Sequence, residues 1–134
     1  MDSILKSFAI SSLPADGGVL RWPIDFALHK NPGIAFDIPL PLSIIVAFTI
    51  LVCIVLARYA WSAWPKSARI SAFSVMIIAG ALGNMIDRIT NGFTTDYIIL
   101  FERSAINLAD VLILFGTAAI LWYSRNTSFR KRKN

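Results

Sequence analysis

Residues 40–60, LPLSIIVAFTILVCIVLARYA, form a long apolar run that decides the kind of fold. A helix of this length covers about 30 Å, which is the thickness of the hydrocarbon core of a bilayer. Pro39 and Pro41 stand at its start, where a helix tolerates proline. The composition agrees with a membrane span, since a chain of 134 residues that is 56% hydrophobic and 16% charged is too apolar for an ordinary soluble domain.

Two further segments predict membrane helices. They are residues 70–86, ISAFSVMIIAGALGNMI, and residues 105–123, AINLADVLILFGTAAILWY. The ends of the three spans carry aromatic residues of the kind found at membrane interfaces, namely Trp61, Trp64, Trp122 and Tyr123. We therefore expect an all-α integral membrane protein, a single domain over 1–134 built as a small bundle of three transmembrane helices.

Basic residues at the ends of these spans give an orientation. The connection 58–69 contains three basic residues and no acid, and five of the 13 Lys and Arg residues lie in the last ten positions. By the positive-inside rule, this connection and the basic tail 124–134 are cytoplasmic, while residues 1–38 and the connection 87–104 are extracytoplasmic. The net charge of +5 is then explained as a membrane flank, and no nucleic-acid partner is expected.

The segment before the first span is not typical of a signal peptide, because it has no basic start and no sufficient apolar core. Residues 19–38, VLRWPIDFALHKNPGIAFDI, alternate in polarity in places and contain Asn-Pro-Gly. This pattern predicts a short strand or two and a turn at the membrane surface. Trp22 and Phe26 lie either on that surface or in a substrate groove.

Polar residues gather at one predicted level, the outer edge of the bilayer. Asn84, Asp87 and Arg88 lie on neighbouring turns at the outer end of the second span and can form one cluster. Asp110 is expected five residues inside the third span, with Asn107 three residues before it on the same face. Asp96 follows an Asn-Gly turn, in the short apolar stretch FTTDYII.

Two carboxylates from different elements in a semi-dry site are suited to general acid–base chemistry. Like charges at close range cannot both ionise readily, so the pair supplies one base and one acid. The base takes a proton from water as it attacks a carbonyl carbon, and the acid polarises the carbonyl oxygen. This chemistry needs no cofactor and no metal. The sole histidine, His29, and the sole cysteine, Cys53, provide neither a zinc site nor a Ser-His triad.

Four blocks in this order resemble the lipoprotein signal peptidases (signal peptidase II) of bacterial inner membranes. NPGIAF at 31–36 is similar to the family's N-x-G-x-A-F, and AGALGNMIDRI at 79–89 to its G-G-x-x-G-N-x-x-D-R. GFTTDYI at 92–98 is similar to G-x-V-x-D-F-I, with Thr94 and Tyr97 as departures. INLAD at 106–110 is similar to F-N-x-A-D, with Ile106 in place of Phe.

The resemblance implies an aspartic endopeptidase that removes the signal peptide from prolipoproteins, before a cysteine that carries diacylglycerol. It implies Asp96 and Asp110 as the catalytic pair. It also implies supporting or substrate-contacting roles for six residues: Asn31, Gly33, Asn84, Asp87, Arg88 and Asn107. Membrane lipid around the chain, a monomer and inhibition by globomycin-like compounds are expected. The family usually has four spans, the first with an Asp and a Lys. Residues 1–38 have no apolar run of that length, so we expect that helix to be absent.

Two other functions are compatible with the sequence. A catalytically inactive relative would bind lipoprotein precursors or serve as a small membrane subunit, and would tolerate Asp96→Asn and Asp110→Asn. A small transporter would use an intramembrane acid for protons. Away from the polar cluster at the outer edge, the polar residues within the spans are weak and uncharged, as in Thr49 and Ser74, and this clustering at one interface disfavours a transporter.

Overall fold

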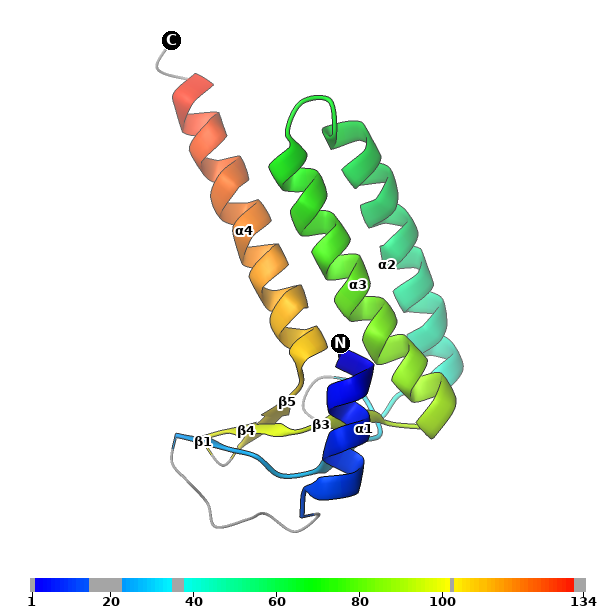
Figure 1. The fold of residues 1–134 in the computed structure, drawn as a ribbon. Coiled ribbons are helices and arrows are strands. Elements are labelled where there is room, and N and C mark those ends of the chain that lie inside the picture. Colours follow the sequence, from blue (N-terminus) through cyan, green and yellow to red (C-terminus); the bar gives the residue numbers. More distant parts are fainter. Residues whose placement is uncertain (1, 15–22, 35–37, 102, 132–134) are drawn as a thin grey trace.

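The computed structural model describes residues 2–14, 23–34, 38–101 and 103–131, with side chains described as far as Asn126. Three long helices dominate it: α2 (Leu42–Ala63), α3 (Ala68–Asn91) and α4 (Leu108–Lys131). In Figure 1, α3 lies between α2 and α4 and runs beside both. Two small sheets and a short helix, α1 (Asp2–Ser12), lie at the end of the bundle where α3 stops and α4 starts.

The prediction of three membrane helices is confirmed for the described residues. By length and composition, α2, α3 and residues Leu108–Asn126 of α4 can each cross a membrane, with mean hydropathies of 2.4, 1.6 and 1.4. Only 6% of the apolar window of α2 is buried inside the protein, so this helix offers most of its surface to lipid. The α3 window is 33% buried, in keeping with its central place.

The helix boundaries differ from the predicted spans 40–60, 70–86 and 105–123, notably where α3 ends and α4 begins beside the strands. α3 continues through residues 87–91 and stops where Gly92 takes a left-handed conformation with φ 79° and donates its N–H to the Arg88 carbonyl. Glycine adopts this conformation at no steric cost, which is why Asn-Gly ends the helix. The third helix begins only at Leu108, because Ser104–Ile106 form a strand instead.

Small residues bring α3 and α4 close together. A Cβ atom at Gly80 would stand 2.5 Å from the Ala109 carbonyl oxygen, and one at Gly116 would stand 2.7 Å from Ile77 Cγ1. In a membrane, helices associate through close packing of this kind, since lipid supplies little hydrophobic driving force. The contact fixes the start of α4 against α3 near their polar ends.

The strands form two sheets at the polar end of the bundle. β1 (Ile24–Asp25), β4 (Ile98–Leu100) and β5 (Ser104–Ile106) make one antiparallel sheet in the order β1-β4-β5. β2 (His29–Asn31) pairs antiparallel with β3 (Thr94–Asp96), with His29 opposite Asp96 and Asn31 opposite Thr94. The strands expected within 19–38 are therefore confirmed at 24–25 and 29–31, whereas 19–22, including Trp22, lies outside the described residues.

Helix α1 has no counterpart in the elements expected from the sequence. Its 11 residues bury Lys6 and Ala9, while Ile4 and Phe8 are 72% and 62% exposed. This inverted pattern, with the cation inside and the apolar residues outside, suits a helix that faces lipid and turns its polar face to the bundle. α1 packs against α3 and β3. At about 16 Å, α1 is shorter than the hydrocarbon core of a bilayer. The expected absence of the family's first span stays a prediction.

Candidate active site

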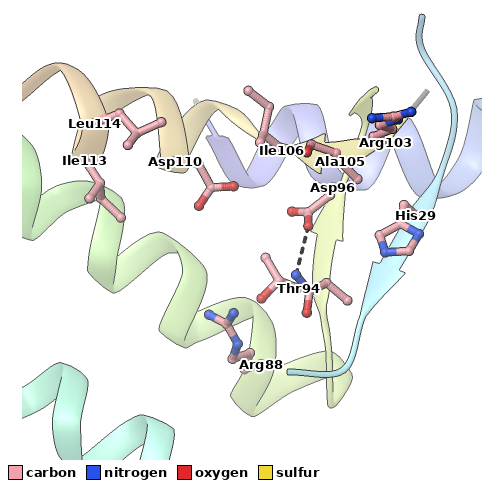
Figure 2. Close-up of a pocket in the computed structure, with 12 residues that line it drawn as sticks. His29, Arg88, Thr94, Asp96, Arg103, Ala105, Ile106, Asp110, Ile113 and Leu114 are labelled. Carbon is pink, nitrogen blue, oxygen red and sulfur yellow. Dashed lines mark hydrogen bonds between the residues drawn. The ribbon is translucent and has the colours of Figure 1, made fainter. Parts of the chain in front are cut away.

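A cavity of about 310 Å³ opens where α3, α4 and the strands meet. Figure 2 shows Asp96 and Asp110 entering it from different elements, β3 and α4. The structure thus brings together the two carboxylates that the sequence singled out. The cavity is lined by His29, Asn31, Arg88, Thr94, Asp96, Arg103, Ser104, Ala105, Ile106, Asp110, Ile113 and Leu114.

Asp96 is buried, with 2% of its surface exposed, and each of its carboxylate oxygens has an amide donor. Asn107 Nδ2 donates to Oδ1 at 2.6 Å, and Asn31 Nδ2 donates to Oδ2 at 3.3 Å. The strand that carries it is fixed from α3, because Asp87 accepts hydrogen bonds from the Thr95 backbone N–H at 2.6 Å and from the Thr95 hydroxyl at 3.2 Å. The Asp96 side chain is therefore held from both sides.

Asp110 lies in the first turn of α4. Its backbone N–H donates to Asn107 Oδ1 at 3.0 Å, and its Oδ2 accepts from the Asn107 backbone N–H at 3.1 Å. This reciprocal pair is a capping box, which satisfies backbone donors at a helix start. The depth expected for Asp110, five residues inside a helix, is wrong because α4 starts three residues later. The Asp110 carboxylate consequently lies at the N-terminus of α4 and lines the cavity.

Asn84 and Asn107 link the two carboxylates. Asn84 Nδ2 donates to Asp110 Oδ1 at 2.8 Å, and Asn107 Nδ2 donates to Asn84 Oδ1 at 3.0 Å as well as to Asp96. Both amides are buried, at 6% and 0% exposure. In these contacts each carboxylate accepts from neutral N–H donors, and the amides fix the directions of its oxygen lone pairs.

The environment raises the pKa of Asp96 from 3.8 to about 6. Burial is the largest cause, because it disfavours the charged form, and the negative charge of Asp110 adds to it. Hydrogen bonds from Asn107 and Asn31 and the charge of His29 act in the opposite direction. Asp96 is thus a carboxyl that changes protonation near neutral pH, as a general acid or base requires.

Asp87 and Arg88 support the site from α3, although in a different way from the cluster expected with Asn84. Arg88 donates to the Gly33 carbonyl oxygen from Nε at 3.1 Å and from Nη2 at 2.8 Å. The Gly33 N–H in turn donates to Asn31 Oδ1 at 2.9 Å. Arg88 therefore holds the turn that follows Asn31 through Gly33, which is 55 residues away and which a helical repeat could not indicate. Ala35 and Phe36 of the same block lie outside the described residues.

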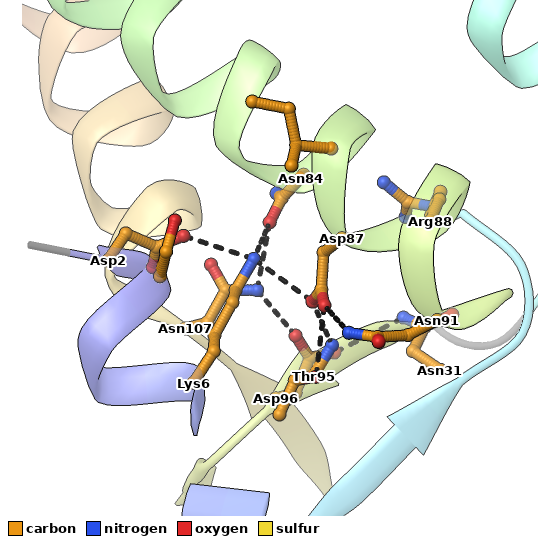
Figure 3. Close-up of polar contacts among 12 residues, drawn as sticks. Asp2, Lys6, Asn31, Asn84, Asp87, Arg88, Asn91, Thr95, Asp96 and Asn107 are labelled. Atoms are coloured by element: carbon orange, nitrogen blue, oxygen red, sulfur yellow. Dashed lines mark hydrogen bonds and ion pairs between the residues drawn. The ribbon is translucent and has the colours of Figure 1, made fainter. Parts of the chain in front are cut away.

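Lys6 is a functional candidate that the sequence reading missed. The residue is 3% exposed, and its ammonium group has three acceptors: Asn84 Oδ1 at 2.9 Å, Asp2 Oδ2 at 3.1 Å and Asp87 Oδ2 at 3.2 Å (Figure 3). An ammonium group has three donors, so its capacity is filled. The signal in the sequence was an Asp and a Lys four residues apart in an otherwise uncharged segment, which places both on one helix face.

A metal site has no support in the described part of the chain, where no three His, Cys, Asp or Glu side chains are grouped closely enough to hold an ion. The chemistry available at the cavity is that of the carboxylates, the amides and the cations around them.

Comparisons with known proteins indicate the family of this chain. The family model for signal peptidase (SPase) II matches residues 1–125. A protein named lipoprotein signal peptidase from Bartonella tribocorum is 32% identical, over 100% of this chain and 85% of its own length. A protein of the same name from Bartonella bacilliformis is 38% identical over 90% of this chain and 78% of its own length.

Solved structures share the fold. A bacterial membrane enzyme solved by the in meso method at 2.3 Å resolution superposes with a TM-score of 0.84 and 22% identity, over 99% of this chain and 85% of its own. A second such structure, at 1.9 Å resolution, gives a TM-score of 0.74 and 24% identity, over 91% of this chain and 83% of its own. With the family model covering nearly the whole chain, this protein belongs to the signal peptidase II family.

Proposed function

We propose that this chain is an aspartic-type endopeptidase that removes signal peptides from diacylglyceryl-modified bacterial prolipoproteins, cleaving immediately before the lipidated cysteine. The observation that carries the proposal is the meeting of Asp96 and Asp110 at one cavity, from different elements and with amide donors on both. The relatives named lipoprotein signal peptidase supply the substrate class.

The mechanism begins with one proton shared by the two carboxyl groups. The ionised carboxylate removes a proton from water, whose oxygen attacks the carbonyl carbon of the residue before the lipidated cysteine. The protonated carboxyl donates its proton to the carbonyl oxygen, which gives a neutral tetrahedral intermediate. Its collapse breaks the C–N bond, and the amine of the cysteine leaves with a proton from the carboxyl that received one from water. As the new carboxylic acid forms, a hydroxyl of the intermediate returns its proton to the carboxylate that had protonated the carbonyl oxygen. This restores the starting pair.

The lining of the cavity suits a substrate that is anchored in lipid. Ile113 and Leu114 of α4 form an apolar side, continuous with the part of the helix that can cross the membrane. Asp110 lies in the first turn of α4, and Asp96 lies across the same cavity on β3. At this level a signal helix would emerge from the lipid and present its end. A globomycin-like inhibitor would occupy this same cavity. One chain supplies both carboxylates, so a monomer is sufficient.

The arrangement of the helices supports a site on the extracytoplasmic face of the bacterial cytoplasmic membrane. The connection between α2 and α3 and the far end of α4 lie at one end of the bundle, opposite the strands and the cavity (Figure 1). The connection and the α4 end carry the basic residues Lys66, Arg69 and Arg125. Basic flanks favour the cytoplasmic side, which leaves the cavity outside.

The test is cleavage of a diacylglyceryl-modified prolipoprotein by the purified chain in detergent or lipid. Wild type is expected to cleave it and to leave the unmodified precursor intact. Asp96→Asn and Asp110→Asn are expected to lose cleavage while keeping the fold. Asp25→Asn is the matched control, since Asp25 lies on β1 and does not line the cavity. Cleavage at the wild-type rate by either dyad variant would refute the assignment. A wild-type chain that binds the precursor without cleaving it would support the non-catalytic alternative.

A further inference from the structure

His29 lies directly across the sheet from Asp96. The register of β2 and β3 makes the two residues Cα partners. Side chains of directly opposite residues in an antiparallel pair stand on the same face, with Cβ atoms about 5 Å apart. Both side chains line the same cavity, and Figure 2 shows the imidazole on β2 beside the strand that carries Asp96. His29 is therefore a third titratable side chain at the cavity, beside Asp96 and Asp110.

The other charged groups around the cavity come from the elements that face His29. Asp96 lies on β3, Asp110 on α4, Arg88 on α3 and Arg103 in the connection between β4 and β5. The two arginines stay cationic at every working pH. An imidazole instead changes its charge between pH 5 and 8.

The neighbouring residue on the strand provides a natural comparison. Lys30 follows His29 on β2, so its side chain points to the opposite face of the strand. Its ammonium group lies 5.1 Å from the centre of the Phe93 ring and does not line the cavity. Two basic residues on one short strand thus differ in whether they face the carboxylates.

We propose that His29 is a positioning residue for charge, whose imidazolium form stabilises the ionised state of Asp96 and extends activity into mildly acidic conditions. The proposal rests on the proposed function of the dyad. The charge of His29 acts on Asp96 in the sense required, since it opposes the effects of burial and of Asp110. An opposite charge at this range favours the carboxylate, so the first proton leaves the pair at a lower pH.

The test is the pH profile of kcat for prolipoprotein cleavage by wild type and by His29→Gln. In the variant, the acidic limb is expected to move upward by on the order of one pH unit, which is about a tenfold loss of rate well below the limb. The alkaline limb is expected to stay in place. Lys30→Gln removes a charge from the same strand and is expected to move neither limb.

Two results would overturn the proposal. One is an acidic limb that does not move in His29→Gln, and the other is a loss of rate that is uniform across pH, as a merely structural role would give. A second measurement needs no cleavage at all. In chains with ¹³C-carboxyl-labelled aspartate, the Asp96 resonance, assigned from its loss in Asp96→Asn, is titrated with and without His29. An unchanged midpoint refutes the proposal. Wild type that shows the shifted midpoint but never cleaves would instead refute the proposed function alone.

Discussion

Replacing Asp96 by asparagine tests the electrostatic account of the site, because it is expected to remove activity and to stabilise the fold at the same time. Asp96 is 2% exposed, and the pKa of its carboxyl rises from 3.8 to about 6 on folding. A folded-state pKa above the unfolded value means that ionisation weakens the fold. The wild-type contribution is therefore most favourable below pH 4 and is lost as pH rises through 6.

The magnitude follows from that shift. The rise of about 2 in the pKa of Asp96 corresponds to roughly 3 kcal/mol of folding free energy that is lost when Asp96 is ionised. Asparagine cannot accept from both neighbouring amides, so the variant also loses the 3.3 Å hydrogen bond from Asn31. That loss costs about 1 kcal/mol. Asp96→Asn is therefore expected to be about 2 kcal/mol more stable than wild type at pH 8, and slightly less stable at pH 4.

The assay is reversible unfolding in mixed micelles, followed by tryptophan fluorescence, at intervals from pH 4 to pH 8. The stability difference between variant and wild type should grow between pH 4 and pH 6 and then remain level. Asp25→Asn controls for the change in net charge, since Asp25 lies outside the cavity. A difference that does not depend on pH, or an Asp96→Asn chain that is less stable at pH 8, would refute the claim that burial and Asp110 raise the pKa of Asp96.

Three further substitutions test the supporting contacts. Lys6→Met should destabilise the fold by about 3 kcal/mol or more, because it leaves buried carboxylates without their cation; Ser7→Ala, an exposed neighbour, should have little effect in the same unfolding assay. Gly80→Ala should cost about 2 kcal/mol, since its Cβ would meet a backbone oxygen of α4 at 2.5 Å. Gly83→Ala meets only a side-chain oxygen at 3.1 Å and should cost less; equal losses would contradict the packing argument. Arg88→Lys should lower kcat/KM roughly tenfold by removing the two-point hold on the 33–34 loop, about 1–2 kcal/mol, and an unchanged value would exclude that role.

The proposed catalytic pair illustrates what proton sharing would require from this fold. Hydrogen bonds link Asp96 and Asp110 through the neutral amides of Asn84 and Asn107. A cation in direct contact would stabilise both ionised forms and remove the acid from the pair. Lys6 instead contacts the carbonyl oxygen of Asn84, so its charge reaches the pair through an oriented amide.

The sequence by itself determined the three apolar helices, the turn at Asn91-Gly92 and the two aspartates. These features depend on local properties: hydropathy summed along one segment, a residue that tolerates a left-handed conformation, and short blocks in a recognisable order. Such properties are complete within a few neighbouring residues. They could therefore be predicted without knowing how any segment packs against another.

Only the tertiary structure decided which groups meet. The contact of Lys6 with Asn84 joins residues 78 positions apart, and that of Arg88 with Gly33 joins residues 55 apart. Helix α1 escaped prediction because its lysine is buried and its apolar residues are exposed, the reverse of the pattern in water. His29 faces Asp96 only because β2 and β3 pair in one register, and a shift by one residue would turn its imidazole to the other face of the sheet.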